Sequence, residues 1–128
     1  MYKKTVSRMN LKEYLKLSYK RAPFGRYSFP RPAIVCKDGF TVSIQGSSHH
    51  YCTPKDENVE YSHLEIGFPE PFDNWLAETL NEPVQDVYGY VSCNIIDTLL
   101  ERHGGIDEEA MLATLTMMEL VDETCWVR

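Results

Sequence analysis

The sequence lacks any run of about 18 to 20 uncharged apolar residues, the length that a membrane-spanning helix requires. Its first residues include no apolar stretch of the kind that directs secretion. We therefore expect a soluble protein that works in the cytoplasm and does not act at a membrane.

Paired cysteines are absent as well. Cys36, Cys52, Cys93 and Cys125 are spread evenly along the chain, and no C-x-x-C pair occurs. A disulfide framework in a small secreted domain uses a higher density of cysteines. We therefore predict four reduced and mostly buried thiols in a reducing compartment.

Recognised motifs for catalysis and metal binding are also missing, since the sequence contains no H-E-x-x-H and no nucleophile elbow. Possible zinc ligands do cluster, but their spacing matches no known site, and the adjacent His49 and His50 would point to opposite sides of an extended chain. The cluster comprises His49, His50, Cys52, His63 and Glu65. We predict no catalytic residue, no metal and no cofactor, so the protein is expected not to be an enzyme.

The charged residues are distributed very unevenly. Residues 1–37 hold ten of the 13 lysines and arginines against one acid, Glu13, a net charge of +9; the other 91 residues hold three bases and 18 acids, a net charge of −15. We predict a basic N-terminal helix and arm at about residues 1–32 and an acidic core at about 33–128. The arm should contact its own core, a second subunit or a partner.

Apolar residues at helical spacing predict four helices, at about residues 10–22, 71–80, 94–103 and 107–121. Asn10 and Asp73 are placed to cap the first two helices, and Gly104-Gly105 to end the third with a left-handed conformation. With 43% apolar side chains in 128 residues, the chain can build one core of moderate size. We therefore predict that residues 1–128 form a single domain.

Alternating apolar and polar residues predict β-strands on both sides of Asp38-Gly39 and at residues 61–68 and 87–93. The Asp38-Gly39 pair is typical of a two-residue type I′ hairpin turn, in which both central residues have positive φ. Leu64, Ile66 and Phe68 should face the core. The predicted fold class is α+β, with an antiparallel sheet of about four or five strands and helices packed on one side.

This alternation leaves the sheet with a polar second face, which is either an ordinary solvated face or a contact surface for a ligand. Its tyrosines favour the second alternative, because they offer large rigid areas for stacking. The residues of this face are Thr41, Ser43, Gln45, Tyr61, His63, Glu65, Tyr88 and Tyr90.

The arm alternates arginines with aromatic residues at Arg21, Phe24, Arg26, Tyr27, Phe29 and Arg31. Guanidinium groups match phosphate oxygens, and aromatic rings can stack on nucleobases. A small phosphorylated ligand suits the charge balance better than a long nucleic acid, which the acidic core would repel. The alternative is that these side chains clamp the arm onto the core or a second subunit. The predicted ligand-binding residues are Arg21, Phe24, Arg26, Tyr27, Arg31, His63, Glu65, Tyr88 and Tyr90.

Four short motifs resemble a recurrent group of small proteins of bacteriophages and prophages of Gram-positive bacteria. They are HYCxP at residues 50–54, HLEIGFP at 63–69, VYGYV at 87–91 and HGG at 103–105. The resemblance covers about residues 34–106 and attaches no activity to any residue. It implies a counter-defence protein that acts in the cytoplasm of a bacterial host cell.

Two classes of counter-defence protein are similar in the residues they use. Anti-Thoeris and anti-CBASS sponges are oligomers that sequester cyclic nucleotide signals, and anti-CRISPR proteins are acidic inhibitors of host nucleases. The leading hypothesis is a homo-oligomeric sponge that sequesters a small phosphorylated ligand, such as a cyclic nucleotide. The alternatives are an acidic inhibitor of a host defence protein, and a structural or regulatory phage protein without a ligand. The acids that would mimic phosphates are Glu57, Glu60, Glu70, Asp73, Glu78, Glu82, Asp86 and those of residues 107–123.

Overall fold

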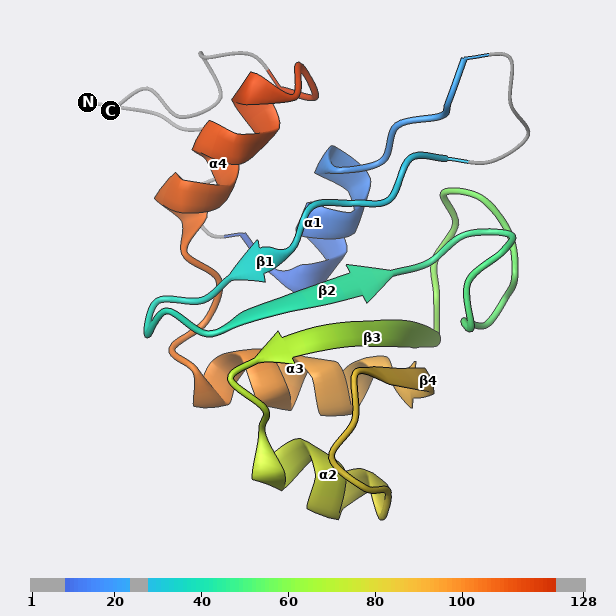
Figure 1. The fold of residues 1–128 in the computed structure, drawn as a ribbon. Helices are drawn as coiled ribbons and strands as arrows, with labels where there is room; N and C mark the ends of the chain where they lie inside the picture. The colour runs from blue at the N-terminus through green and yellow to red at the C-terminus, as the bar shows by residue number, and fades with distance from the viewer. Residues whose placement is uncertain (1–8, 24–27, 122–128) are drawn as a thin grey trace.

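The computed structural model describes residues 9–23 and 28–121, which form a four-stranded antiparallel sheet and four helices (Figure 1). The strands follow one another in the order β1-β2-β3-β4. This arrangement confirms the predicted α+β class. The elements are α1 (Leu11–Leu17), β1 (Ile34–Val35), β2 (Thr41–Gln45), β3 (His63–Glu70), α2 (Asn74–Leu80), β4 (Val87–Ser92), α3 (Cys93–Arg102) and α4 (Glu108–Met117).

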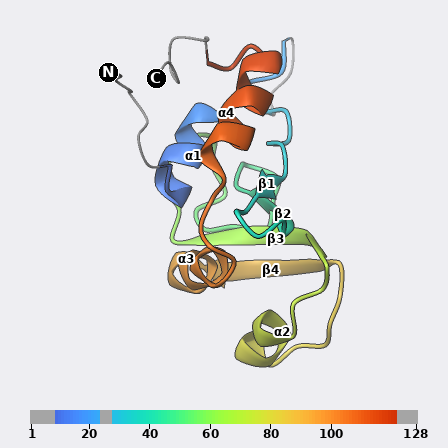
Figure 2. The same cartoon turned by 90° about the vertical axis from the view of Figure 1, so that its left-hand side faces the viewer.

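The helices are arranged around one face and one edge of the sheet. Figure 2 shows α1 and α3 on the same side of the strands, with α4 beside α1 and with α2 beyond the β4 edge. One cluster of buried apolar side chains joins these elements, and it includes Tyr14 of α1, Ile44 of β2, Leu99 of α3 and Leu115 of α4. The sheet and the helices therefore share a single hydrophobic core.

Short side chains cap the helices much as their positions in the sequence predict. The Asn10 side chain accepts a hydrogen bond from the backbone N–H of Glu13, and Asp73 accepts one from Leu76. The cap of α3 is Ser92, so this helix begins before the predicted Asn94. Two helices are shorter than predicted, because α1 ends at Leu17 and α4 at Met117.

The predicted hairpin is confirmed, but its predicted turn type is wrong. Gly39 has a φ of +96°, whereas Asp38 is not among the described residues with positive φ. The backbone N–H of Gly39 bonds to the carbonyl of Cys36, and the N–H of Cys36 bonds to the carbonyl of Phe40. This pattern is that of a three-residue loop, in which Lys37 and Asp38 form a type I turn and Gly39 is the left-handed residue that follows it.

Two β-bulges interrupt the regular alternation of the sheet. Thr41 pairs with Glu70 and Ser43 with Gly67, so β3 holds one extra residue there. Phe68 lies in this bulge with a φ of +51° and is 64% exposed, which corrects the prediction that it faces the core. A bulge changes which side of the sheet the neighbouring side chains face. The alternation of residues in the sequence does not reveal this change.

The second bulge lies in β4. Leu64 pairs with Val91 and Ile66 with Tyr88, so the same stretch of the ladder spans three residue steps in β4 and two in β3. Tyr90 has a φ of +55° at this bulge and is half exposed, whereas Tyr88 is buried on the same side as Val91. Tyr88 and Tyr90 therefore point to different sides of the sheet, and the predicted tyrosine face is wrong for Tyr88.

No helix within residues 9–23 and 28–121 has the length and apolar character needed to cross a membrane.

Candidate functional site

Arg31 is the most unusual of the predicted ligand-binding residues, because its side chain is only 4% exposed. Its Nε donates to the carbonyl of Leu15 at 3.1 Å, and its Nη1 donates to the carbonyl of Gly46 at 2.7 Å. Nη2 is buried and has no hydrogen-bond partner within the described residues. Desolvation by burial lowers the pKa of this guanidinium.

The backbone of Arg31 is fixed by a second residue of the predicted site region, Gln45. The Gln45 side chain accepts from the backbone N–H of Arg31 at 2.9 Å and donates to its carbonyl at 2.8 Å. Gln45 is buried as a result, so this end of the predicted polar face is covered by the chain itself. The guanidinium of Arg31 is thereby placed under α1.

The described ends of the arm pack on their own core. Tyr19 donates a hydrogen bond to Glu57 at 3.3 Å, and Glu57 also accepts from the backbone and the hydroxyl of Ser48. Burial alone would raise the pKa of Glu57, but the hydrogen bonds from Ser48, Ser28 and Tyr19 lower it to about 2. Glu57 is therefore an ionised acceptor that ties the arm to the loop after β2.

Two further arm residues, Arg21 and Phe29, are held by backbone contacts within the arm. Arg21 pairs with Ser28 in an isolated antiparallel bridge, and the backbone N–H of Phe29 donates to the carbonyl of Lys20 at 2.8 Å. The predicted residues Phe24, Arg26 and Tyr27 lie outside the described residues.

Three predicted residues do lie on the outer side of the sheet. Glu65 accepts a hydrogen bond from the backbone N–H of Tyr51 at 2.9 Å. The rings of Tyr51 and Tyr90 are 5.9 Å apart, and the Lys55 ammonium lies over both of them. His63, two residues before Glu65 on β3, bonds through Nδ1 to the hydroxyl of Ser62.

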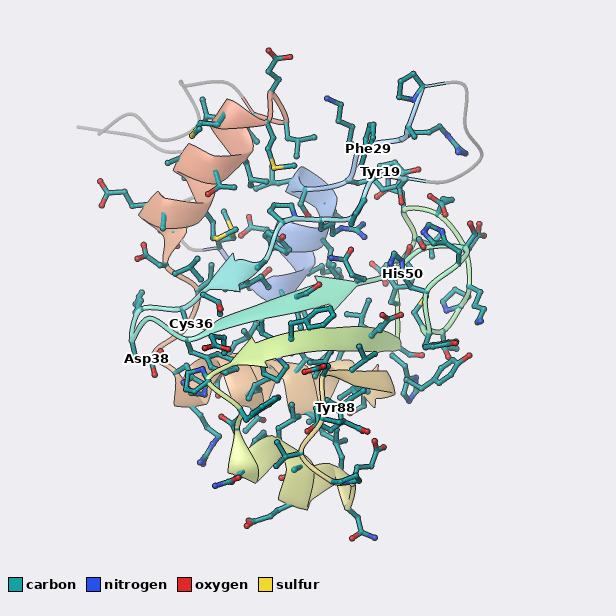
Figure 3. All side chains as sticks on the ribbon, in the orientation of Figure 1. Tyr19, Phe29, Cys36, Asp38, His50 and Tyr88 are labelled. Carbon is teal, nitrogen blue, oxygen red and sulfur yellow. The ribbon has the colours of Figure 1, made fainter. Side chains whose placement is uncertain are left out.

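Tyr88 is absent from this outer group. Its side chain is 1% exposed, and its hydroxyl accepts from the N–H of Gln85 and donates to the carbonyl of Pro83. Figure 3 shows Tyr88 near α2, far from Tyr19 and Phe29 at the opposite end of the molecule. The structure therefore divides the predicted site into a buried Arg31, a core Tyr88 and a separate outer face.

A groove between α1 and α3 has a volume of about 860 Å³. Arg31 lines it together with residues of both helices and of the loop before β3. Pockets of about 300 to 1,000 Å³ are typical for small-molecule ligands. The residues that carry its chemistry are Lys12, Lys16, Arg31, Glu60, Tyr61, Cys93, Asp97 and Glu101.

The charges in the groove are separated between its walls. On the α1 wall, Lys12 forms an ion pair with Glu60 at 3.1 Å, so these two charges balance each other. Lys16 and the buried Arg31 add positive charge on the same side. Asp97 and Glu101 stand on the α3 wall, and desolvation by burial and the charge of Glu101 together raise the pKa of Asp97.

Sequence reasoning missed the α3 wall of this groove. Asp97 and Glu101 are four residues apart, which places them on one side of a helix. That spacing was a usable signal for a shared surface. The sequence does not indicate that this surface faces α1, because the packing of two helices is decided by residues distant in the chain.

The side chains that the sequence suggested as possible zinc ligands form other contacts in the structure. Ser47 bonds to the Nδ1 atoms of both His49 and His50, and the Sγ of Cys52 donates to the carbonyl of Ser47. Within residues 9–23 and 28–121, no three His, Cys, Asp or Glu side chains are placed to hold a metal ion.

No protein-family model, curated protein or solved structure matches this chain. The resemblance to phage and prophage proteins therefore stays a prediction.

Proposed function

We propose that this protein binds a small phosphorylated ligand in the groove between α1 and α3 and releases it unchanged. The observation that carries this proposal is the buried guanidinium of Arg31, which lines the groove and has an Nη2 without a partner. A buried charge is costly unless an opposite charge compensates it. No ion pair with Arg31 occurs among the described residues, so an anionic ligand would supply the missing charge.

The other features of the groove fit a phosphorylated ligand. Lys16 lies on the same wall as Arg31 and can add a second cation, since it forms no ion pair within the described part of the chain. Tyr61 offers an aromatic ring at the same groove. Because Nη2 is itself covered, the phosphate would reach it only after lining side chains have moved aside.

The lining of the groove favours binding over catalysis. Its candidate nucleophile is Cys93, whose Sγ donates to the carbonyl of Tyr61 at 3.2 Å. Burial, assisted by Asp97, raises the pKa of this thiol, so little thiolate would be present near neutral pH. The groove also includes no histidine that could act as its base.

The alternative of an acidic inhibitor is less well supported, because several of its acids serve the fold. Glu57 binds Tyr19 and Ser48, Glu60 pairs with Lys12, and Asp73 contacts His103. Acids that are already paired are weaker mimics of a phosphate backbone.

The test is calorimetric titration of the full chain with cyclic di- and trinucleotides and the isomers of cyclic ADP-ribose, followed by recovery of the intact ligand. Lys16→Gln should weaken binding about ten- to a hundredfold, as expected for the loss of a charge-assisted bond. Lys37→Gln is the matched control, because Lys37 is exposed outside the groove. Arg31→Lys tests the guanidinium itself, with its thermal unfolding measured in parallel.

The groove would be rejected as the ligand site if no compound of the panel binds, or if Lys16→Gln and Lys37→Gln lose affinity equally. Tight binding to a host defence protein in place of the panel would favour the acidic inhibitor.

A further inference from the structure

Opposite walls of the α1–α3 groove carry opposite charges that the protein does not pair with each other. Arg31 and Lys16 stand at one side, and Asp97 and Glu101 at the other. Within the described residues, the ion pairs are Lys12 with Glu60 and His103 with Asp38 and Asp73, so none involves either carboxylate of α3. The groove is therefore dipolar, with an anion-binding wall and a wall of carboxylate acceptors.

The α3 carboxylates have a chemical preference of their own. An ionised carboxylate only accepts hydrogen bonds, and it prefers donors such as ammonium, guanidinium or amino groups. Asp97 and Glu101 also repel each other, and the pKa of Asp97 is raised by burial and by this neighbour. A positively polarised group between them would relieve both effects.

An acidic pair alone would be an ordinary solvated helix surface. The second observation is Arg31 in the same groove, which is 4% exposed, and whose Nη2 has no partner. The two features together describe complementary ends of one ligand rather than two unrelated surfaces.

From this juxtaposition we infer that the ligand bears amino groups opposite its phosphate, and that Asp97 and Glu101 select for them. This inference rests on the proposed function and specifies the class of phosphorylated ligand. Nucleotides whose base carries an exocyclic amine belong to this class. The phosphate lies toward Arg31 and Lys16, and the amine donates to the carboxylates of α3.

The sharpest probes are two nucleotides that differ only in the amine. Adenosine 5′-monophosphate and purine riboside 5′-monophosphate share the phosphate, the sugar and the ring, and the second lacks the 6-amino group. The cyclic dinucleotides of the same two nucleosides extend the comparison. We expect the amino-bearing compound of each pair to bind about ten- to a hundredfold more tightly.

The variant Asp97→Asn with Glu101→Gln should reduce this preference to within about threefold while phosphate-dependent binding persists. The matched control is Glu78→Gln with Asp86→Asn, two exposed acids that do not line the groove. It should keep the full preference.

The possible results distinguish failure of the amine inference from failure of the proposed function. If both compounds of a pair bind equally to the wild type and Lys16→Gln weakens both, the amine inference is overturned and the proposed function stands. A preference that survives in the α3 double variant also overturns it. If neither compound of either pair binds, and the wider panel is silent as well, both proposals fail.

Discussion

His103 lies between Asp38 and Asp73, with its Nδ1 at 2.7 Å from one carboxylate and its Nε2 at 2.6 Å from the other. The ring also stacks on Phe40, with centroids 3.8 Å apart. Ionised carboxylates can only accept hydrogen bonds, so this geometry requires an imidazole protonated on both nitrogens. A single charged ring thus joins the β1–β2 turn, the start of α2 and the end of α3.

The first prediction concerns the pH dependence of stability. Burial alone would lower the pKa of His103, but the hydrogen bonds to Asp73 and Asp38 outweigh it and raise the pKa. In the unfolded chain the pKa is about 6.5. The stabilising contribution is therefore fully present below about pH 6.5 and is lost as the pH rises through the raised value. Urea denaturation from about pH 6 to about pH 9 should show this loss.

The variant His103→Gln should be less stable at the acidic end of this range, by about 1 to 3 kcal/mol, and should lack the decline at higher pH. His63→Gln is the control, because its ring bonds to Ser62 at the start of β3 and to neither aspartate. Parallel pH profiles for the wild type and His103→Gln would contradict the assignment.

A second prediction tests the hairpin turn. Gly39 has a φ of +96°, and a Cβ placed there would meet no atom within 4 Å. Gly39→Ala should therefore destabilise the fold by about 1 to 2 kcal/mol through backbone strain alone. Gly67→Ala is the matched control, because its Cβ would lie in ordinary contact with Ser43 and its φ is not positive. Thermal denaturation that finds the two variants equally stable would argue against the turn.

A third prediction separates the two tyrosines of β4. Tyr88→Ala should cost about 3 to 5 kcal/mol, because it empties a fully buried aromatic site. Tyr90→Ala should change the free energy of unfolding by no more than about 0.5 kcal/mol, because Tyr90 is half exposed at the bulge. Chemical denaturation of both variants measures the difference. A large loss of stability in Tyr90→Ala would contradict the position of Tyr90 at an exposed bulge.

A fourth prediction concerns thiol reactivity. Cys36 and Cys52 are buried and Cys93 is half-buried, and burial raises the pKa of all three thiols, that of Cys36 to about 11. A thiol reagent should therefore modify Cys93 before Cys36 in the native protein. All four cysteines should react after denaturation without a reductant. Fewer than four reactive thiols after denaturation would indicate a disulfide.

Features that depend on neighbouring residues could be predicted from the sequence. Asn10 and Asp73 cap their helices because a short polar side chain can reach a backbone N–H three residues ahead, whatever the rest of the fold does. Gly104 and Gly105 both take the left-handed conformation expected of them after α3. The antiparallel hairpin around Gly39 follows from the same local logic.

Features that depend on distant segments could not be predicted. Phe68 and Tyr88 fit a regular alternation in the sequence, and only the pairing of each strand with its neighbour reveals the bulges that leave Phe68 exposed and Tyr88 in the core. Arg31 belongs to a segment whose basic composition is typical of an exposed arm. It is buried because the carbonyls of Leu15 and Gly46 accept hydrogen bonds from its guanidinium. The α1–α3 groove could not be predicted from the sequence for the same reason.

The order of the strands along the sheet has a consequence for how the protein forms during synthesis. Each strand pairs with the next one in the chain, so the sheet can assemble while the ribosome is still at work. The seven-residue α1 is too short to persist alone, and the bond from Met9, which precedes its cap, to Glu108 crosses 99 positions. Although α1 is made before α3 and α4, it is therefore among the last elements to become stable, and we expect the groove to form only once α3 and α4 have left the ribosome.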